Sequence, residues 1–125
     1  MQQRAHAPYS SFFVGAALET DEQTIIGGCN IESASYGLTM CAERVALFQA
    51  LSQGFKNFTS LVLVSDSGAY PCGACRQLLY EFAPDASIII ATPSKIIEQT
   101  SVKLLFPHAF CNKNLALQKK GSNYE

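Results

Sequence analysis

Two short cysteine motifs carry the residues of this 125-residue sequence that are best suited to chemistry. Pro71-Cys72-Gly73-Ala74-Cys75 places two thiols three residues apart, so both can reach one metal ion from the start of a helix. Taken alone, such a pair is typical both of structural zinc and of thiol–disulfide exchange. The second motif, Cys41-Ala42-Glu43-Arg44, adds a third thiol and a carboxylate. Three protein ligands leave the fourth tetrahedral position of zinc open, which is typical of catalytic sites.

Glu43 is the candidate proton carrier of such a site. Zinc can lower the pKa of a bound water molecule to about 7, and a nearby carboxylate that is not a ligand can accept the proton and pass it on. Cys41 and Glu43 lie about 200° apart on an ideal helix, so they can converge only where the helix begins. A helix N-terminus also favours thiolate over thiol. The spacing therefore predicts two helix N-termini facing one zinc ion, with Arg44 offsetting part of the negative charge.

The elements that must position these motifs alternate between strands and helices. Four segments have the patterns of strands: residues 12–19, 23–29, 61–64 and 88–91. Two segments have the pattern of helices: residues 41–53 and 72–82. Residues 102–105 predict a further strand. This order predicts an α/β fold with a single mixed sheet, an N-terminal antiparallel hairpin plus parallel strands, sandwiched by helices.

Length and composition limit the class of protein. The chain has room for one domain, which we expect over residues 1–118, followed by a polar tail over residues 119–125. Hydrophobic residues make up 48% of the chain and charged residues only 15%, which indicates apolar surface covered by partner subunits. A net charge of −1 and a pI of about 6.1 differ from the strongly basic profile of a nucleic-acid binder.

Targeting signals are missing from the sequence pattern. No apolar stretch has the length that spans a bilayer, and residues 1–10 lack the apolar core of a secretory signal. We therefore expect a cytoplasmic protein that binds neither nucleic acid nor membrane. In a reducing compartment, five cysteines in a short chain indicate metal binding more than disulfides. Cys29 is then most simply a small buried hydrophobe, and Cys111 an incidental thiol.

Several motifs, in their order along the chain, resemble the small zinc-dependent cytidine deaminases that act on free nucleosides. A Cys or His, one residue, Glu and then Pro-Cys-x-x-Cys form the signature of zinc deaminases of nucleobases. The resemblance runs from Ala7 to Phe110. It includes Ala7-Pro8-Tyr9-Ser10-Ser11-Phe12, Val14-Gly15-Ala16-Ala17, Gly28-Cys29-Asn30-Ile31-Glu32, Tyr36-Gly37, Cys41-Ala42-Glu43-Arg44 and residues 71–77.

The resemblance implies substrate contacts at matching positions. Phe12 is implied to lie against the pyrimidine, and the backbone near Ala42 to help recognise the base. Asn30 and Glu32 are implied to bind the ribose, with Glu32 accepting a charge-assisted hydrogen bond from the 3′-hydroxyl. The implied reaction is hydrolytic deamination of cytidine and 2′-deoxycytidine to uridine and 2′-deoxyuridine plus ammonia, as in pyrimidine salvage. A zinc-bound hydroxide attacks C4, while Glu43 protonates N3 and assists the departure of ammonia.

The resemblance also implies a metal set and an assembly. One Zn²⁺ per subunit is held by the three thiolates of Cys41, Cys72 and Cys75, and Arg44 hydrogen-bonds to a ligand sulfur. The family is typically a homotetramer in which neighbouring subunits complete each active site. Tyr36 and Phe110 are implied to reach across these interfaces.

Three features depart from the family pattern. Only residues 1–6 precede the Ala7 motif, well inside what is usually an N-terminal helix. The loop at residues 67–70 looks short, and Leu105-Phe106-Pro107 stands where the family has Leu-Leu-Pro, which bears on the assignment of Phe110.

Other interpretations of the same residues remain open. Without the resemblance, Phe12 is an inward strand residue and Asn30-Ile31-Glu32 a polar loop. Three tyrosines are interpreted as packing residues, namely Tyr9, Tyr70 and Tyr80. At the level of function, one alternative is a structural-zinc interaction module. The other is a deaminase of another cytosine compound, such as a nucleoside antibiotic or cytosine in polynucleotides, and the acidic pI argues against polymers.

Overall fold

The computed structural model describes residues 1–115. The strands are β1 (Val14–Thr20), β2 (Ile25–Cys29), β3 (Phe58–Ser65), β4 (Ser87–Ala91) and β5 (Ile96–Ser101). The helices are α1 (Ala42–Ser52), α2 (Gly73–Phe82) and α3 (Val102–Leu105), with 3₁₀ turns η1 (Gln2–Arg4), η2 (Tyr36–Leu38) and η3 (Asn112–Leu115). The expected polar tail at residues 119–125 lies outside the described residues, as do residues 116–118 of the expected domain.

The five strands form one mixed sheet in the order β2-β1-β3-β4-β5. β1 pairs antiparallel with β2 and β3, β3 pairs parallel with β4, and β4 pairs antiparallel with β5. The predicted single mixed sheet, with its N-terminal hairpin, is therefore confirmed.

The prediction of a strand over residues 102–105 is wrong. These residues form α3, which begins where the Ser101 hydroxyl accepts a hydrogen bond from the Leu104 backbone N–H at 3.2 Å. The fifth strand is instead β5, whose residues are mostly exposed. An edge strand without a buried face has no alternating pattern, so the sequence offered no signal for it.

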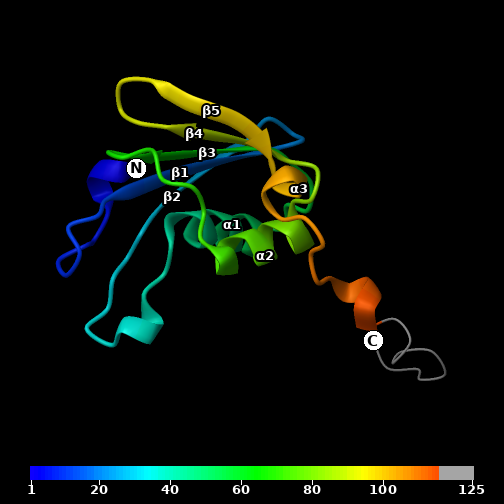
Figure 1. Cartoon of the computed structure of the whole chain (residues 1–125), viewed down its shortest axis with the longest axis horizontal. Coiled ribbons are helices and arrows are strands. Elements are labelled where there is room, and N and C mark those ends of the chain that lie inside the picture. The colour runs from blue at the N-terminus through cyan, green and yellow to red at the C-terminus, as the bar shows by residue number, and fades with distance from the viewer. Residues whose placement is uncertain (116–125) are drawn as a thin grey trace.

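Both longer helices lie on one face of the sheet, whereas the sequence predicted helices on both (Figure 1). The reason is the direction of the crossovers. The connection from β2 to β3 passes over β1, and the connection from β3 to β4 continues the same way across the sheet. Because such crossovers are right-handed, two steps in one direction place both helices on the same side. The opposite face is contacted by η1, next to β1.

The core lies between this face of the sheet and the two helices. Its fully buried side chains come from the strands and both helices: Leu18, Leu47, Leu61, Leu79, Ile88 and Ile90. Helix α1 approaches the sheet closely at Gly28 of β2, where a Cβ atom would lie 2.6 Å from the Ala42 carbonyl oxygen and from the Ala46 nitrogen. The start of α1 is thus fixed against the hairpin. Within residues 1–115, no helix is both long and apolar enough to cross a membrane.

Candidate metal centre and active site

Three cysteine sulfurs from two helix starts meet in one cluster. The Sγ atoms of Cys41 and Cys72 are 3.9 Å apart, those of Cys72 and Cys75 are 3.4 Å apart, and all three lie within 4.8 Å of one another. Zn–S bonds of about 2.3 Å in a tetrahedron place sulfurs about 3.8 Å apart, so the cluster has the dimensions of a zinc site. None of the five cysteines forms a disulfide bond within residues 1–115. No other group of three metal-ligating side chains is found among residues 1–115.

The two helices begin at the cysteines themselves. Cys41 is the N-cap of α1 and Cys72 the N-cap of α2, and neither sulfur makes a capping hydrogen bond to its own helix. Each carbonyl still accepts the first helical hydrogen bond, from Val45 and from Arg76. Both sulfurs are therefore available to a metal at the positive ends of two helices. This is the convergence at helix starts that the spacing of Cys41 and Glu43 requires.

Arg76 fixes the approach to the second helix. Its Nε donates to the Pro71 carbonyl at 2.8 Å, and its Nη1 donates to the Leu105 carbonyl at 3.0 Å. One guanidinium thus joins the residue before Cys72 to the end of α3. This contact holds the turn that presents Cys72 and Cys75.

The pKa values of the clustered thiols indicate that the cluster suits a cation. Hydrogen bonding from Cys75, together with the Arg44 guanidinium, lowers the pKa of Cys41 to about 5. Hydrogen bonding to Cys41 raises the pKa of Cys75, and burial and the nearby charges of Glu43 and Cys41 act in the same direction. Three adjacent thiolates therefore need positive charge beyond that of Arg44, and a divalent ion supplies it.

Arg44 lies against the cluster. Its Nη2 donates to Cys41 Sγ at 3.3 Å. Its Nε is buried and has no hydrogen-bond partner among the described residues. A guanidinium that donates to Cys41 Sγ favours the thiolate form of this sulfur, because a charged donor stabilises a charged acceptor.

Glu43 projects into the same region from the first turn of α1. The residue is only 5% exposed, and burial raises the pKa of its carboxyl, with the nearby charge of Cys41 acting in the same direction. A carboxyl whose pKa is raised can both hold and release a proton nearer to neutral pH. It is not one of the three residues of the metal cluster.

A cavity of about 310 Å³ opens onto this group, and we call it the Glu43 cavity. Four of the predicted substrate-binding residues line it together with Cys41 and Cys72: Phe12, Asn30, Glu32 and Ala42. The N-terminal segment, the β2–α1 connection and the start of α1 thus supply one wall each. Its size suits a small organic molecule.

Asn30 and Glu32 also hold the N-terminal wall in place. Asn30 Oδ1 accepts from the Val14 backbone N–H at 3.0 Å, and its Nδ2 donates to the Phe12 carbonyl at 2.7 Å. Glu32 accepts hydrogen bonds from the backbone N–H groups of Tyr9 and Ser10, at 2.9 and 3.1 Å, and from the Ser10 hydroxyl. The Ser10 hydroxyl is the largest cause of the lowered pKa of Glu32. These two side chains therefore fix the backbone that carries Phe12.

Two predicted residues do not line the Glu43 cavity of their own chain. Tyr36 is 72% exposed and packs edge-to-face on Tyr9, with ring centroids 5.6 Å apart. It lines a neighbouring cavity that shares Ser10, Glu32 and Thr39 with the Glu43 cavity. Phe110 is 56% exposed, and its carbonyl accepts a hydrogen bond from Gln77 Nε2 at 2.9 Å. Both residues are thus exposed on the single chain.

Seven further lining residues were not predicted from the sequence: Ser10, Val14, Thr39, Met40, Leu63, Ala69 and Tyr70. Val14 and Leu63 have ordinary core character, so only their position at the strand ends brings them to the cavity. Ser10 lies within the Ala7 to Phe12 motif, in which the resemblance implies a role for Phe12 alone. Tyr70 precedes Pro71 and was interpreted as a packing residue.

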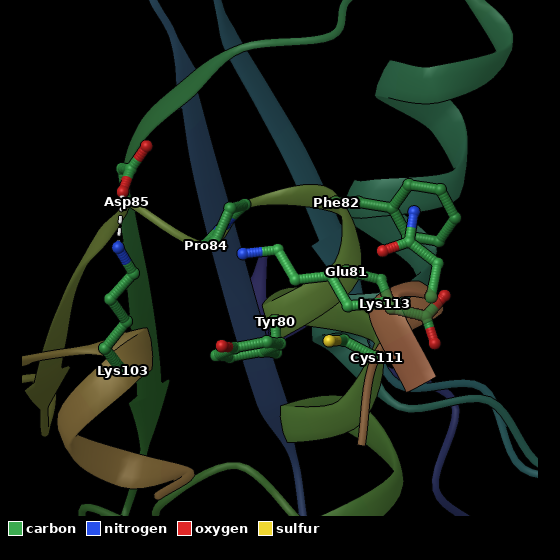
Figure 2. Close-up of a pocket in the computed structure, with 9 residues that line it drawn as sticks. Tyr80, Glu81, Phe82, Pro84, Asp85, Lys103, Cys111 and Lys113 are labelled. Atoms are coloured by element: carbon green, nitrogen blue, oxygen red, sulfur yellow. Dashed lines mark hydrogen bonds and ion pairs between the residues drawn. The ribbon is translucent and has the colours of Figure 1, made fainter. Parts of the chain in front are cut away.

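A separate cavity of about 390 Å³ lies at the end of α2, near α3 and η3. Figure 2 shows Tyr80 and Cys111 in this cavity, and Lys103 paired with Asp85 at its side. Cys111 is its single thiol, and the Lys103–Asp85 ion pair is largely exposed. It shares no lining residue with the Glu43 cavity and carries none of the cluster's chemistry.

Comparison with known proteins gives consistent matches. The zinc-binding region of cytidine and deoxycytidylate deaminases matches residues 1–92. A cytidine deaminase of Sporosarcina psychrophila is 44% identical over 118 residues, covering 92% of this chain and 87% of the relative. The crystal structure of a cytidine deaminase from Burkholderia pseudomallei has a TM-score of 0.83 at 41% identity, covering 87% of this chain and 90% of that one. The blasticidin-S deaminase of Bacillus cereus is 34% identical over 102 residues, covering 74% and 73% of the two chains.

Proposed function

The chain belongs to the cytidine and deoxycytidylate deaminase zinc-binding family and is a zinc-dependent hydrolase that deaminates cytidine, and we propose from this premise which residues carry the reaction. Cys41, Cys72 and Cys75 hold one zinc ion per subunit. Their sulfurs lie within 4.8 Å of one another at two helix N-termini, which supports this set of ligands. When bound, zinc supplies a Lewis acid that makes water acidic enough to ionise near neutral pH.

Glu43 moves the protons of the reaction. It accepts a proton from the attacking water and delivers it to N3 of cytosine as the C4–O bond forms. It then transfers the remaining hydroxyl proton to the amino group, so that the C4–N bond breaks, ammonia leaves and the C4 carbonyl of uridine forms. One water is consumed and one ammonia is released. The buried position of Glu43 and its raised pKa support this role, because the same group must take up and return a proton.

Four lining residues position the nucleoside. Phe12 packs against the pyrimidine, the backbone at Ala42 contacts the base, and Asn30 and Glu32 bind the ribose. Three hydrogen bonds already reach the Glu32 carboxylate, whose two oxygens offer about four acceptor sites, so capacity remains for a sugar hydroxyl. Because no residue of this set is assigned to the 2′-hydroxyl, 2′-deoxycytidine is proposed as a second substrate.

A homotetramer completes the site in this proposal. The exposed rings of Tyr36 and Phe110 support a role outside their own Glu43 cavity, and the low charge content supports extensive contacts between subunits. We also propose, from the chain length, that residues 1–118 form the domain. A cytoplasmic location is proposed from the sequence pattern, which contains neither a membrane-spanning stretch nor a secretory signal.

The observation that carries the proposal is the position of Glu43 beside an open cavity that also reaches two cluster cysteines. A structural-zinc module requires the cysteines but neither the cavity nor a buried carboxyl. When zinc-loaded protein is incubated with cytidine, the cytosine absorbance band of the mixture should disappear. One ammonia should be released for each cytidine consumed. If zinc-loaded, folded protein leaves the band unchanged, the zinc is structural and the proposal is wrong.

A second candidate substrate is a cytosine nucleoside antibiotic. It is favoured by the 34% identity to a blasticidin-S deaminase over 102 residues. The experiment is a panel of cytidine, 2′-deoxycytidine, free cytosine, blasticidin S and single-stranded DNA at one enzyme concentration. We expect the highest kcat/KM for the two nucleosides. A higher value for blasticidin S would assign the chain to the antibiotic.

A further inference from the structure

We propose that Tyr70, held by Glu98 of β5, is a specificity-determining wall of the Glu43 cavity that limits the size of the group on the substrate's exocyclic nitrogen. This inference rests on the proposed role of the cavity as the cytidine site. Tyr70 lines the cavity together with its neighbour Ala69, and its hydroxyl donates a hydrogen bond to the Glu98 carboxylate. Tyr70, which is 41% exposed, therefore has a hydrogen-bond partner outside the cavity that it borders.

The loop that carries Tyr70 is held at its start by Ser65 and lies against β5 at Gly68. After β3, the Ser65 hydroxyl accepts from the Ala69 N–H at 2.9 Å, and the Ser65 carbonyl accepts from the Gly68 N–H at 3.3 Å. Gly68 has a positive φ of 70° and lies so near β5 that a Cβ atom would be 2.9 Å from Ile97 Cγ1. The loop is thus fixed against the β4–β5 hairpin, which lies at the same end of the sheet (Figure 1).

Within residues 1–115, the Glu98 side chain makes one hydrogen bond, which it accepts from Tyr70. β5 is an edge strand whose residues from Ile96 to Gln99 are exposed, so it adds little to the core. Its partner residue in β4 is the buried Ile90, which places Glu98 on the helix-covered face and toward the loop. The edge strand therefore serves as the support of the cavity loop, with Tyr70 as the point of contact.

The position of Tyr70 identifies which end of the cavity it limits. Only Pro71 separates it from Cys72, so the two Cα atoms lie within about 7 Å of each other. Ser10, Glu32 and Thr39 approach the cavity from the N-terminal segment and the β2–α1 connection instead. Because the carbon that reacts lies at the cysteines, the amino group that leaves it lies at the Tyr70 end. A substituent on that nitrogen has to fit beside the Tyr70 ring.

The size of the effect follows from the way that pockets discriminate. One additional methyl group in a closed pocket changes relative recognition by about 10- to 200-fold. A rigid aromatic wall excludes such a group more strongly than a mobile one, because a mobile ring can move aside at little cost. Loss of the Glu98 contact should therefore weaken the discrimination against a substituted exocyclic nitrogen. The change should be smaller than the change caused by loss of the Tyr70 ring.

The test compares cytidine with N4-methylcytidine, which adds one methyl group at the nitrogen concerned. KM for cytidine and the inhibition constant of N4-methylcytidine against cytidine deamination are measured for the wild type, Tyr70→Ala, Tyr70→Phe and Glu98→Ala. The ratio of inhibition constant to KM should fall by at least about tenfold in Tyr70→Ala. Tyr70→Phe and Glu98→Ala should each give a smaller fall, because both lose the hydrogen bond but keep the ring. Tyr80→Phe, on α2 and outside the cavity, is the matched control and should keep the wild-type ratio.

The outcomes separate this inference from the proposed function. If the wild type shows no cytidine turnover, the proposed function fails. Suppose instead that the wild type is active and that Tyr70→Ala is folded and zinc-loaded but keeps the wild-type ratio. Tyr70 then does not limit this end of the cavity, and only the inference is overturned. If Tyr70→Ala does not fold, Glu98→Ala on the exposed edge strand provides the test. An unchanged ratio of inhibition constant to KM in Glu98→Ala would overturn the inference that Glu98 holds Tyr70 as a wall of the cavity.

Discussion

At the residue scale, the cluster combines three thiols with one arginine in a partly buried position. Cys41 is drawn toward the thiolate form while Cys75 is held as a thiol, so the group cannot ionise completely without a cation. Arg44 contributes positive charge through its contact with Cys41 Sγ at 3.3 Å. Glu43 lies beside these charges as a buried carboxyl with a raised pKa. Two predictions follow from this arrangement of charge.

Glu43→Gln should abolish proton transfer without loss of metal. Glutamine keeps the size and polarity of the side chain but cannot accept and return a proton, so we expect kcat to fall by about 10²- to 10⁴-fold. Zinc content, measured by elemental analysis, and thermal stability should remain near the wild-type values. Glu22→Gln, in the exposed turn after β1, is the matched control. If zinc were lost together with activity in Glu43→Gln, the carboxyl would also hold the metal.

Zinc should be released when the pH falls. Ligand cysteines must be thiolates, so protons compete with the metal, and affinity decreases as the pH decreases. In the metal-free cluster the pKa of Cys41 is lowered and that of Cys75 is raised, so zinc binding must displace at least the proton of Cys75. We expect a chromophoric chelator to extract zinc much faster at about pH 5 than at about pH 7.5. Cys111→Ser should follow the wild-type curve, and equal extraction rates at both pH values would contradict the assignment of thiolate ligands.

At the element scale, the site depends on where α1 and α2 begin. Cys41 and Cys72 occupy the N-cap positions, so a helix that started one residue earlier or later would turn its sulfur away. The start of α1 is fixed by its close approach to β2 at Gly28. The start of α2 is fixed by the Arg76 contacts to Pro71 and Leu105.

Gly28→Ala should therefore destabilise the fold and disturb the metal centre together. The added Cβ would lie 2.6 Å from the Ala42 carbonyl oxygen and the Ala46 nitrogen, both backbone atoms, so helix and strand must separate. Overpacking of this kind costs about 1–3 kcal/mol, and displacement of α1 should also weaken zinc binding. Urea unfolding and zinc titration measure the two effects. Gly37→Ala is the control, since a Cβ there meets nothing within 4 Å, and equal stability of both variants would show that α1 does not need this contact.

At the scale of the whole molecule, the single chain leaves several large apolar side chains exposed. Tyr36, Leu38 and Phe110 are among those that are more than half exposed. Shared sites between subunits would give these side chains a function. In such an assembly a defect in one subunit can be compensated by its neighbour.

This sharing can be tested by mixing two inactive variants. If Phe110 completes the neighbour's site, Glu43→Gln and Phe110→Ala subunits co-assembled in equal amounts should regain up to about one quarter of wild-type activity, because random mixing pairs an intact Glu43 with an intact neighbouring Phe110 at that frequency. Mass spectrometry of the intact assembly should verify that mixed oligomers form. Mixed oligomers that stay as inactive as either parent would contradict a shared site. A monomeric wild type by light scattering would contradict the homotetramer itself.

The metal centre and most of the sheet could be predicted from local patterns. The Cys41 and Cys72 motifs have spacings that permit few arrangements around a metal, and the β-branched runs of β3 and β4 report burial directly. β5 and α3 could not be predicted, because an exposed edge strand has no apolar face and a four-residue helix has too few residues for a periodic pattern. The placement of α1 and α2 on one face depended on strand order, which no local pattern contains.

The sequence by itself determined the chemistry, namely three thiols and a carboxyl that converge at helix starts, because these features depend on residue type and near-neighbour spacing. Only the tertiary structure decided the surroundings of that chemistry. It joined Asn30 and Glu32 to the backbone around Phe12, and it brought Tyr70 to the cavity through a contact with Glu98, 28 residues away along the chain. Such contacts arise from strand order and loop path, and these follow from packing of the whole chain rather than from any single segment.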